Sequence, residues 1–421
     1  MSGRRRTPLV LLWVSHGCAA TASTATFVAI PWFVLMTTGS ATRVGVVTAA
    51  ELVGLVAVSL VTGPLVDRVG ARRTVLVSDV AGAASVVSIP MLHITAGLAF
   101  WQLIALSAVL GASREPGHTA RRMMVPELIA HSGVPMERGA GGMDAAKRAG
   151  EMLGAPLAGV ALALVDAPGV LVGNAGLFLL AAGLTLLGVP RTAVRSPESS
   201  TRTSQYFCEI AEGLRYLRRD RLIAAILAML LITNMLDVAA FAVLFPSYAD
   251  QVLHSPVALG AIVGVFGGSA LVGNIVFTWV GHRAGSRRHL FTASMVIGTT
   301  SPHVAMALES GLVTVLIVVA IAGLAASTVN PVLAVVTYER IPAELRGRVL
   351  SMTTVVAQGG TPLGVLIGGI LVDGVGLLPT LWMVVASYLT ALSAPLLFPV
   401  WAQMDDPGTT RPRDAAVESA A

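Results

Sequence analysis

The sequence predicts an all-α membrane protein whose twelve transmembrane helices form two pseudo-symmetric bundles of six. Three observations lead to this fold class. The chain of 421 residues is 55% hydrophobic and only 12% charged, with a mean hydropathy of +0.78, whereas a soluble domain carries about 25% charged residues. Long apolar runs recur between short basic clusters, and the second half of the chain repeats features of the first.

A membrane-spanning helix needs roughly 20 mainly apolar residues. Twelve segments meet this requirement: 8–37, 43–66, 74–95, 97–116, 139–165, 168–189, 221–249, 257–280, 289–308, 311–337, 348–373 and 377–402. The first segment follows Arg4, Arg5 and Arg6 and is too long for the apolar core of a signal peptide, so we expect it to be retained as a helix.

The basic residues favour an even number of helices. If the N-terminus lies in the cytoplasm, each of the 28 Lys and Arg residues except Arg43 falls on a cytoplasmic tail, loop or helix flank. Cytoplasmic loops are enriched in Lys and Arg. We therefore expect a multi-pass protein of the bacterial cytoplasmic membrane with both termini inside. The net charge of +5 then reflects orientation in the lipid bilayer, and no nucleic-acid partner is expected.

The two halves of the chain repeat. Shifted by 215 residues, the second half returns Gly45 as Gly260 and Arg68 as Arg283, which predicts two bundles related by parallel pseudo-symmetry. The predicted domains are an N-terminal six-helix bundle (1–190), a cytoplasmic linker with an amphipathic helix (191–220), a C-terminal six-helix bundle (221–402) and a disordered cytoplasmic tail (403–421).

The turn between the second and third segments carries a recognisable pattern. It reads Gly63-Pro64-Leu65-Val66-Asp67-Arg68-Val69-Gly70-Ala71-Arg72-Arg73. It resembles the signature loop of the major facilitator superfamily, Gly-x-Leu-x-Asp-Arg-x-Gly-x-Arg-[Arg/Lys]. The resemblance implies a secondary transporter with an inner gate that closes when Asp67 meets the N-terminal end of helix 11. The gating residues implied by this loop, its repeat and that helix end are Gly63, Asp67, Arg68, Gly70, Arg72, Arg73, Arg283, Arg287 and Arg346.

The fifth segment resembles the antiporter motif Gly-x-x-x-Gly-Pro-x-x-Gly-Gly, with Pro156 displaced by one position and Ala158 replacing a glycine. This resemblance implies export. Small residues also permit close helix packing, which we expect at Gly150, Gly154 and Pro156, and in helix 11 at Gly360 and Gly364. The run 341–348 and part of the linker resemble the macrolide and siderophore exporter group. The drug exporters with an arginine in the middle of helix 4 are not matched, because 103–110 carries no charge.

Ionisable residues inside membrane helices are costly and mark candidate functional sites. Asp237 and Glu51 have no basic residue nearby in the sequence, so we rank them first and second as proton-coupling candidates. Glu151 is the third candidate. It lies four residues from Lys147 and three from Arg148, so it forms either an internal ion-pair network or a proton site.

The family resemblance also implies a central cavity lined by helices 1, 4, 7 and 10. This places six polar residues as candidate substrate contacts: His16, Thr24, Asn234, Asp237, Thr328 and Asn330. For His16, a structural role and a titrating role both remain open.

The chain has no phosphate-binding Gly-x-x-x-x-Gly-Lys loop, no His/Cys metal spacing and no hydrolase serine context. We expect no enzyme activity, no metal and no cofactor, with the proton gradient as energy source. The predicted function is export of a small amphipathic compound, such as a drug, an antibiotic or a siderophore-like product, by a monomer. Two alternatives remain: a nutrient importer on the same fold, and a membrane protein that senses a ligand or holds a partner without transport.

Overall fold

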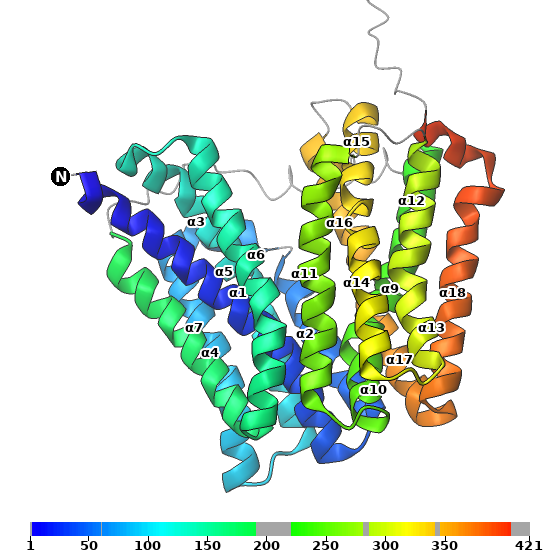
Figure 1. Ribbon diagram of the computed structural model, residues 1–421. Helices are drawn as coiled ribbons and strands as arrows, with labels where there is room; N and C mark the ends of the chain where they lie inside the picture. Colours follow the sequence, from blue (N-terminus) through cyan, green and yellow to red (C-terminus); the bar gives the residue numbers. More distant parts are fainter. Residues whose placement is uncertain (1, 60, 191–219, 281–285, 342–345, 406–421) are drawn as a thin grey trace, which may run out of the picture.

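The structure is a computed structural model that describes residues 2–59, 61–190, 220–280, 286–341 and 346–405. The described chain is a set of long helices packed side by side in two groups (Figure 1). Helix α1 begins on the same side as the last described residues, and we call this the terminal side. The opposite side, where α1 turns into α2, is the far side.

The first group contains six rods. They are α1 (Ser2–Thr38), α2 (Ala41–Ser59) continued by α3 (Thr62–Val69), α4 (Ala71–Thr95), α5 (Phe100–Ser132), α6 (Met136–Leu164) and α7 (Ala167–Gly188). Helix α1 packs against α6 and α7, and α5 packs against α2 and α4. Gly70 has a φ of 90° in the turn between α3 and α4, a conformation that glycine adopts without steric cost.

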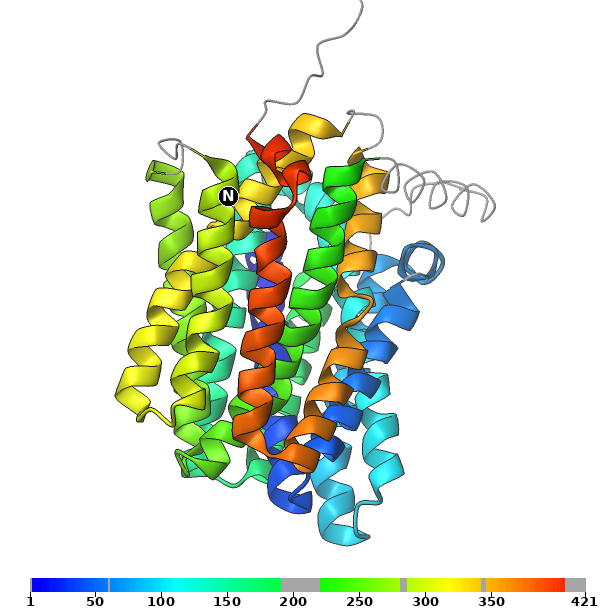
Figure 2. The same cartoon turned by 90° about the vertical axis from the view of Figure 1, so that its right-hand side faces the viewer.

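The second group also contains six rods, four of which change geometry along their length. They are α9 (Arg221–Ala239) with the π-helix η1 (Ala240–Leu244) and α10 (Phe245–Gln251); α11 (Pro256–Val280); α12 (Arg287–Met295) with the π-helix η3 (Val296–Thr300) and α13 (Ser301–Ala307); α14 (Leu312–Ala326) with α15 (Val329–Arg340); α16 (Arg346–Gln358) with α17 (Thr361–Val375); and α18 (Leu377–Leu397). The short η4 (Pro399–Met404) follows on the terminal side (Figure 2).

These twelve rods of the described chain confirm the predicted fold class. Nine of the described helical stretches are long and apolar enough to cross a membrane. The other three rods, α5, α6 and the α12–η3–α13 stack, run alongside them in the same bundles (Figure 1).

One predicted boundary is wrong. The fourth segment was predicted over 97–116, but α5 runs from Phe100 to Ser132. The reason is that its charged residues have partners on neighbouring helices. Arg114 is paired with Glu51 of α2, and Arg121 is paired with Asp79 of α4. The charges are therefore accommodated inside the bundle and do not mark a loop.

The two groups meet on the far side through two helix pairs, α2 with α17 and α6 with α11. Their backbones touch at glycines. A Cβ on Gly45 would lie 2.7 Å from the Val365 carbonyl oxygen, and one on Gly159 would lie 2.5 Å from the Cα of Gly260. Both are closer than real Cβ contacts, so these helix pairs can approach this closely only because the residues are glycine. We call the two pairs the far-side seam.

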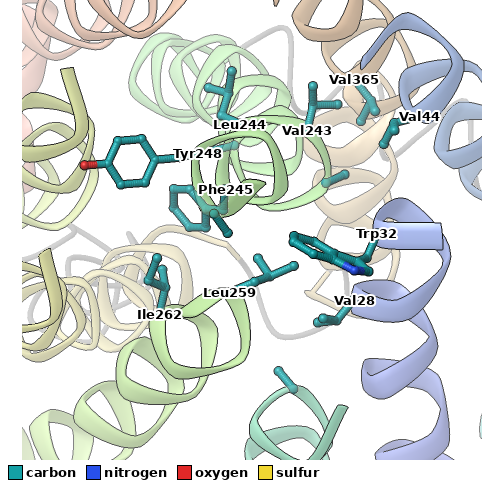
Figure 3. Close-up of a cluster of buried hydrophobic side chains, with 14 of the residues drawn as sticks. Val28, Trp32, Val44, Val243, Leu244, Phe245, Tyr248, Leu259, Ile262 and Val365 are labelled. Carbon is teal, nitrogen blue, oxygen red and sulfur yellow. The ribbon is translucent and has the colours of Figure 1, made fainter. Parts of the chain in front are cut away.

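One hydrophobic core spans both groups at this seam (Figure 3). Trp32 of α1 and Val44 of α2 face Leu259, Phe245 and Val365 from the second group. All five side chains are buried. Burial of such residues contributes about 1.5–3 kcal/mol each relative to exposure in water, so this core holds the far side closed.

The prediction of an amphipathic linker helix falls within 191–219, outside the described residues. The predicted tail begins at 403, but Met404 belongs to η4 and is fully buried in the core. The chain therefore stays packed beyond the expected end of the second bundle.

Candidate functional site

A cavity of about 550 Å³ lies between the two groups. Its wall from the first group is Glu151 and its neighbours on α6. The remainder comes from α9, η1, α10, α11, α12, η3, α13, α14 and α15. Helix α6 runs toward the far side, so Glu151 lies on the terminal side of the seam at Gly159. The cavity is thus closed by the seam on the far side.

Most of the wall is apolar or aromatic. Its larger apolar members are Met152, Leu230, Phe241, Phe245, Val263, Phe266, Leu271, Met295 and Val319. The polar side chains set among them are Arg148, Glu151, Thr233, Asn234, Asp237, Asn274, Thr299, His303, Ser327 and Asn330. An apolar pocket with few polar groups is typical of a small-molecule site.

Asp237 is the acidic residue that the second group contributes to this wall. The Tyr388 hydroxyl of α18 donates a hydrogen bond of 2.6 Å to its Oδ1. No ion pair joins Asp237 to another described residue. Three residues later α9 passes into the π-helix η1. Single π turns inside α-helices are frequent at functional sites.

Two residues beside Asp237 were not singled out from the sequence. His303 lines the cavity, and its ring lies 5.4 Å from the ring of Tyr388. Its Nδ1 lies 2.6 Å from the Thr299 carbonyl oxygen. A histidine inside an apolar segment was the sequence signal for the first residue. Tyr388 carried none, because its link to Asp237 spans 151 residues.

The other polar residues expected in the cavity divide into two sets. Asn234 and Asn330 line this cavity, and the Asn234 side-chain amide also donates to the Ala357 carbonyl at 3.0 Å. Thr328 is not among the lining residues. Its hydroxyl donates to Ser294 at 2.6 Å, so it links the break between α14 and α15 to α12.

A second, smaller cavity of about 190 Å³ is lined only by residues of the first group. His16 and Thr24 line it, together with Arg114, Glu115, His118, Arg121, Lys147 and Glu151. The His16 ring is 3% exposed and lies 5.1 Å from the ring of His118. Neither ring nitrogen of His16 has a hydrogen-bond partner among the described residues. Glu151 borders both cavities.

Glu51 has no base nearby in the sequence, but the fold supplies one. Arg114 of α5 donates to its Oε1 at 2.8 Å, and the Glu51 side chain is 5% exposed. The two residues are 63 positions apart, so no local pattern could reveal the pair. Glu51 is neutralised where it lies, which leaves Asp237 as the candidate acid without an ion-pair partner in the described chain.

A buried ion pair in the first group was also missed. Arg121 donates to Asp79 at 2.5 Å, with 3% and 4% of the side chains exposed. Asp79 was visible as an acid inside segment 74–95. In contrast, Lys147 and Glu151 form the expected i,i+4 pair at 3.3 Å, while Asp144 pairs with Arg122 on α5.

The predicted gate loop lies on the terminal side at α3 and α4. Asp67 is half-buried and makes no hydrogen bond or ion pair to another described residue. Gly63, Arg68 and Arg73 are exposed, while Arg72 donates to the Leu186 carbonyl at 2.6 Å.

The repeat of this loop is described only in part. Arg288 donates to the Pro395 and Leu396 carbonyls at 2.6 and 2.9 Å, so its contacts match those of Arg72. Arg287 instead forms a bidentate salt bridge with Glu339, with N–O distances of 2.6 and 3.1 Å. Arg283 and the side chain of Arg346 lie outside the described residues.

The predicted packing glycines lie at helix contacts. A Cβ on Gly154 would come 2.7 Å from the Thr21 carbonyl of α1, and one on Gly150 would overlap the Gly17 carbonyl. Gly360 and Gly364 face Met235 of α9 in the same way, and the Pro156 ring packs on Gly264 of α11. Among the residues described, no group of three or more His, Cys, Asp or Glu could hold a metal ion.

The family model described as the Major Facilitator Superfamily matches residues 12–238 and 227–420, which together span nearly all of the chain. The protein belongs to the Major Facilitator Superfamily. This confirms the family that the gate loop indicated.

Relatives in this superfamily carry names that bear on transport. The chain is 29% identical over 407 residues to the multidrug efflux pump Tap of Mycobacterium tuberculosis, covering 94% of this chain and 96% of the relative. It is 28% identical over 400 residues to the pump of the same name from Mycolicibacterium fortuitum, with 94% and 95% covered.

Solved structures of this superfamily share the fold. The nucleoside transporter NupG matches with a TM-score of 0.73 at 10% identity, covering 92% of this chain and 98% of NupG. A D-xylose-proton symporter matches with a TM-score of 0.69 at 13% identity, covering 93% and 97%. At these identities the likeness concerns the fold alone.

Proposed function

We propose that this protein exports a small amphipathic compound across the bacterial cytoplasmic membrane, in exchange for protons. The observation that carries the proposal is the cavity of about 550 Å³ between the two groups, apolar over most of its wall and closed at the far-side seam. Its single unpaired candidate acid, Asp237, supports coupling to protons. The efflux-pump names of relatives that align over 94% of the chain support export over import.

The cavity chemistry favours a compound with an apolar body and a polar group. Three phenylalanines, Phe241, Phe245 and Phe266, offer ring faces and edges, with ring centroids 5.0 and 5.5 Å apart. Aromatic side chains bind apolar bodies by area and cations by their π faces. Asp237 adds one carboxylate in this wall, so a compound that carries an amine fits this site well.

The transport cycle follows from the two groups and their seam. The terminal side corresponds to the cytoplasm under the positive-inside rule, so the described conformation takes substrate from the inside. Rocking of the groups about the midplane then opens the far side to the outside. Proton binding at Asp237 competes with the substrate's polar group, which couples proton entry to substrate release. The protein works as a monomer, without a metal or cofactor.

Everted membrane vesicles test this proposal. Ethidium, a fluorescent amphipathic cation, is added and an acid-inside pH gradient is imposed. Vesicles with the parent protein should accumulate the dye, and Asp237→Asn should abolish accumulation driven by the gradient. The matched control is Asp144→Asn, whose carboxyl is 59% exposed and borders neither cavity; it should leave accumulation unchanged.

Three outcomes would overturn the proposal. If the Asp237→Asn variant accumulates the dye at the parent rate, Asp237 does not couple transport to protons. Uptake of test compounds into intact cells, with no loading of everted vesicles, would identify an importer. A deletion strain can also be tested against a panel of amphipathic drugs and natural products. If its susceptibility is unchanged, and the protein moves none of these compounds in either direction, the protein is a sensor or a partner-binding protein.

A further inference from the structure

An acidic residue of the second group caps a helix of the first group on the far side. Asp373 lies in the last turn of α17, and its carboxylate accepts three hydrogen bonds from the start of α2. The donors are the Ser40 hydroxyl at 2.6 Å, the Ala41 amide at 2.8 Å and the Thr42 amide at 2.9 Å.

This contact crosses between the two groups. The first amides of a helix have no partner within the helix and form its positive end. Helix α2 obtains its capping carboxylate from a residue more than 330 positions away. The other capping carboxylates in the described chain stay within one group: Asp405 accepts from the Arg288 amide of α12 at 3.2 Å, inside the second group, and the remaining two act locally. Asp166 accepts from the Gly169 amide at 2.9 Å, and Asp220 accepts from the Leu222 amide at 2.9 Å.

The backbones beneath the cap are also in contact. A Cβ on Gly369 would lie 2.5 Å from the Ala41 carbonyl oxygen, and the Thr42 hydroxyl donates to the Gly369 carbonyl at 3.3 Å. The cap therefore lies at the outer end of the α2–α17 half of the seam. Separation of the two groups on the far side requires that all of these bonds break.

We propose that Asp373, together with Ser40, Ala41 and Thr42, forms a far-side latch that holds the outer gate closed. The proposal rests on the alternating cycle of the proposed function. Asp373 is exposed and Ser40 is half-buried at the edge of the seam, so water replaces the lost hydrogen bonds when the latch opens. An exposed latch is weak enough to be reversible in every cycle.

The latch has a counterpart at the opposite end of the same two rods. The rod α2–α3 carries Asp67 in its last turn on the terminal side, which is the side where the other rod begins with α16. The rod α16–α17 carries Asp373 in its last turn on the far side, where the first rod begins with α2. Each rod thus carries an aspartate in its last turn, on the side of the protein where the other rod begins. Here Asp373 is bonded, whereas Asp67 has no bond to the described residues, as expected for a state closed only on the far side.

Thiol accessibility of the purified full-length protein tests the latch without requiring a substrate. In a background with Cys18→Ser and Cys208→Ser, one reporter is Ala155→Cys, at a seam position that is 2% exposed and whose carbonyl faces Gly260. A second reporter is Ala270→Cys on the cavity wall. The rate of reaction with a polar maleimide reports which side is open.

Asp373→Asn keeps the shape of the side chain but removes its charge and one acceptor. We expect the Ala155→Cys thiol to react roughly tenfold faster, because weakened hydrogen bonds shift the population toward far-side opening. The Ala270→Cys thiol should react more slowly, because the terminal side closes as the far side opens. Ser40→Ala removes one donor and should shift both rates in the same directions by less.

The matched control is Asp166→Asn. It removes a helix-capping carboxylate on the same side of the protein, but its partner lies within the same group. Both thiols should react at the parent rates in this variant, and Asp373→Glu should restore most of the parent behaviour.

The latch would be refuted if Asp373→Asn left both rates unchanged, or if it raised both together, since that pattern indicates loosening and not a change of side. An equal effect of Asp166→Asn would also refute it. These outcomes are independent of ethidium transport. Loss of export with the expected thiol pattern would overturn the proposed function alone.

Discussion

Removal of one charge from the buried Asp79–Arg121 pair should strongly destabilise the first six-helix group. The two side chains are 2.5 Å apart and only 4% and 3% exposed. Asp79→Asn leaves the Arg121 guanidinium charged and without its carboxylate. Breaking a buried pair in this way costs about 3–5 kcal/mol, because the remaining charge has lost both water and its partner.

The double substitution should recover this loss. Asp79→Leu combined with Arg121→Met removes both charges and fills a similar volume. Replacement of a buried ion pair by apolar residues is often neutral or stabilising. We therefore expect the double variant to unfold within about 1 kcal/mol of the parent protein.

Thermal unfolding in detergent, followed by tryptophan fluorescence, measures both effects. A loss of about 3–5 kcal/mol corresponds to a fall in Tm of about 6–20 °C for a unit of 150–250 residues. Arg122→Met is the matched control. Its pair with Asp144 is 3.4 Å long and more than half exposed on both sides, so the change should stay within about 0.5 kcal/mol. A loss below about 1 kcal/mol in Asp79→Asn, or no recovery in the double variant, would contradict the reasoning.

Two further predictions concern helix contacts and a surface pair. Gly111→Ala should destabilise the protein by about 2 kcal/mol or more, since its Cβ would overlap the Glu51 carbonyl oxygen and push α2 from α5. Gly176→Ala, where nothing lies within 4 Å, should be neutral or stabilising by up to about 1 kcal/mol; equal Tm values for both variants would contradict the packing argument. Arg287→Lys loses the two-bond geometry with Glu339, whose side chains are about a third exposed, and should lower stability by only about 0.5 kcal/mol; a Tm shift as large as that of Asp79→Asn would argue against this.

The fold could be predicted from the sequence because its main determinant is local. A membrane helix needs an uninterrupted apolar run, and all twelve runs were visible together with the basic turns between them. The error at α5 shows the limit of this reasoning. Arg114 and Arg121 resemble loop residues along the chain, and only the packing of α5 against α2 and α4 supplies the acids that neutralise them.

The candidate site was only partly accessible to the same reasoning. Asp237 and Asn330 were expected in the cavity as polar residues in apolar segments, and they line it. Thr328 was expected there for the same reason, but its hydroxyl bonds to Ser294 and it is not among the lining residues. Both the break between α14 and α15 and the π turn after Asp237 are followed by a proline, Pro331 and Pro246 respectively. A proline removes a backbone donor from the helix, so the sequence carried a signal for both that was not used.

The glycine contacts of the far-side seam separate two requirements: movement of the two groups and recognition of a compound. Many proteins must satisfy both with the same residues. Where backbone lies on backbone, as at Gly159 and Gly260, there are no side chains to exchange, and the geometry on which the halves pivot is fixed by main-chain shape. Under the proposed function, the chemistry of the compound carried depends on other residues, such as Phe266 and Asn274 of the cavity wall. Substitutions in the cavity wall can therefore change substrate specificity without changing the contacts on which the two groups move.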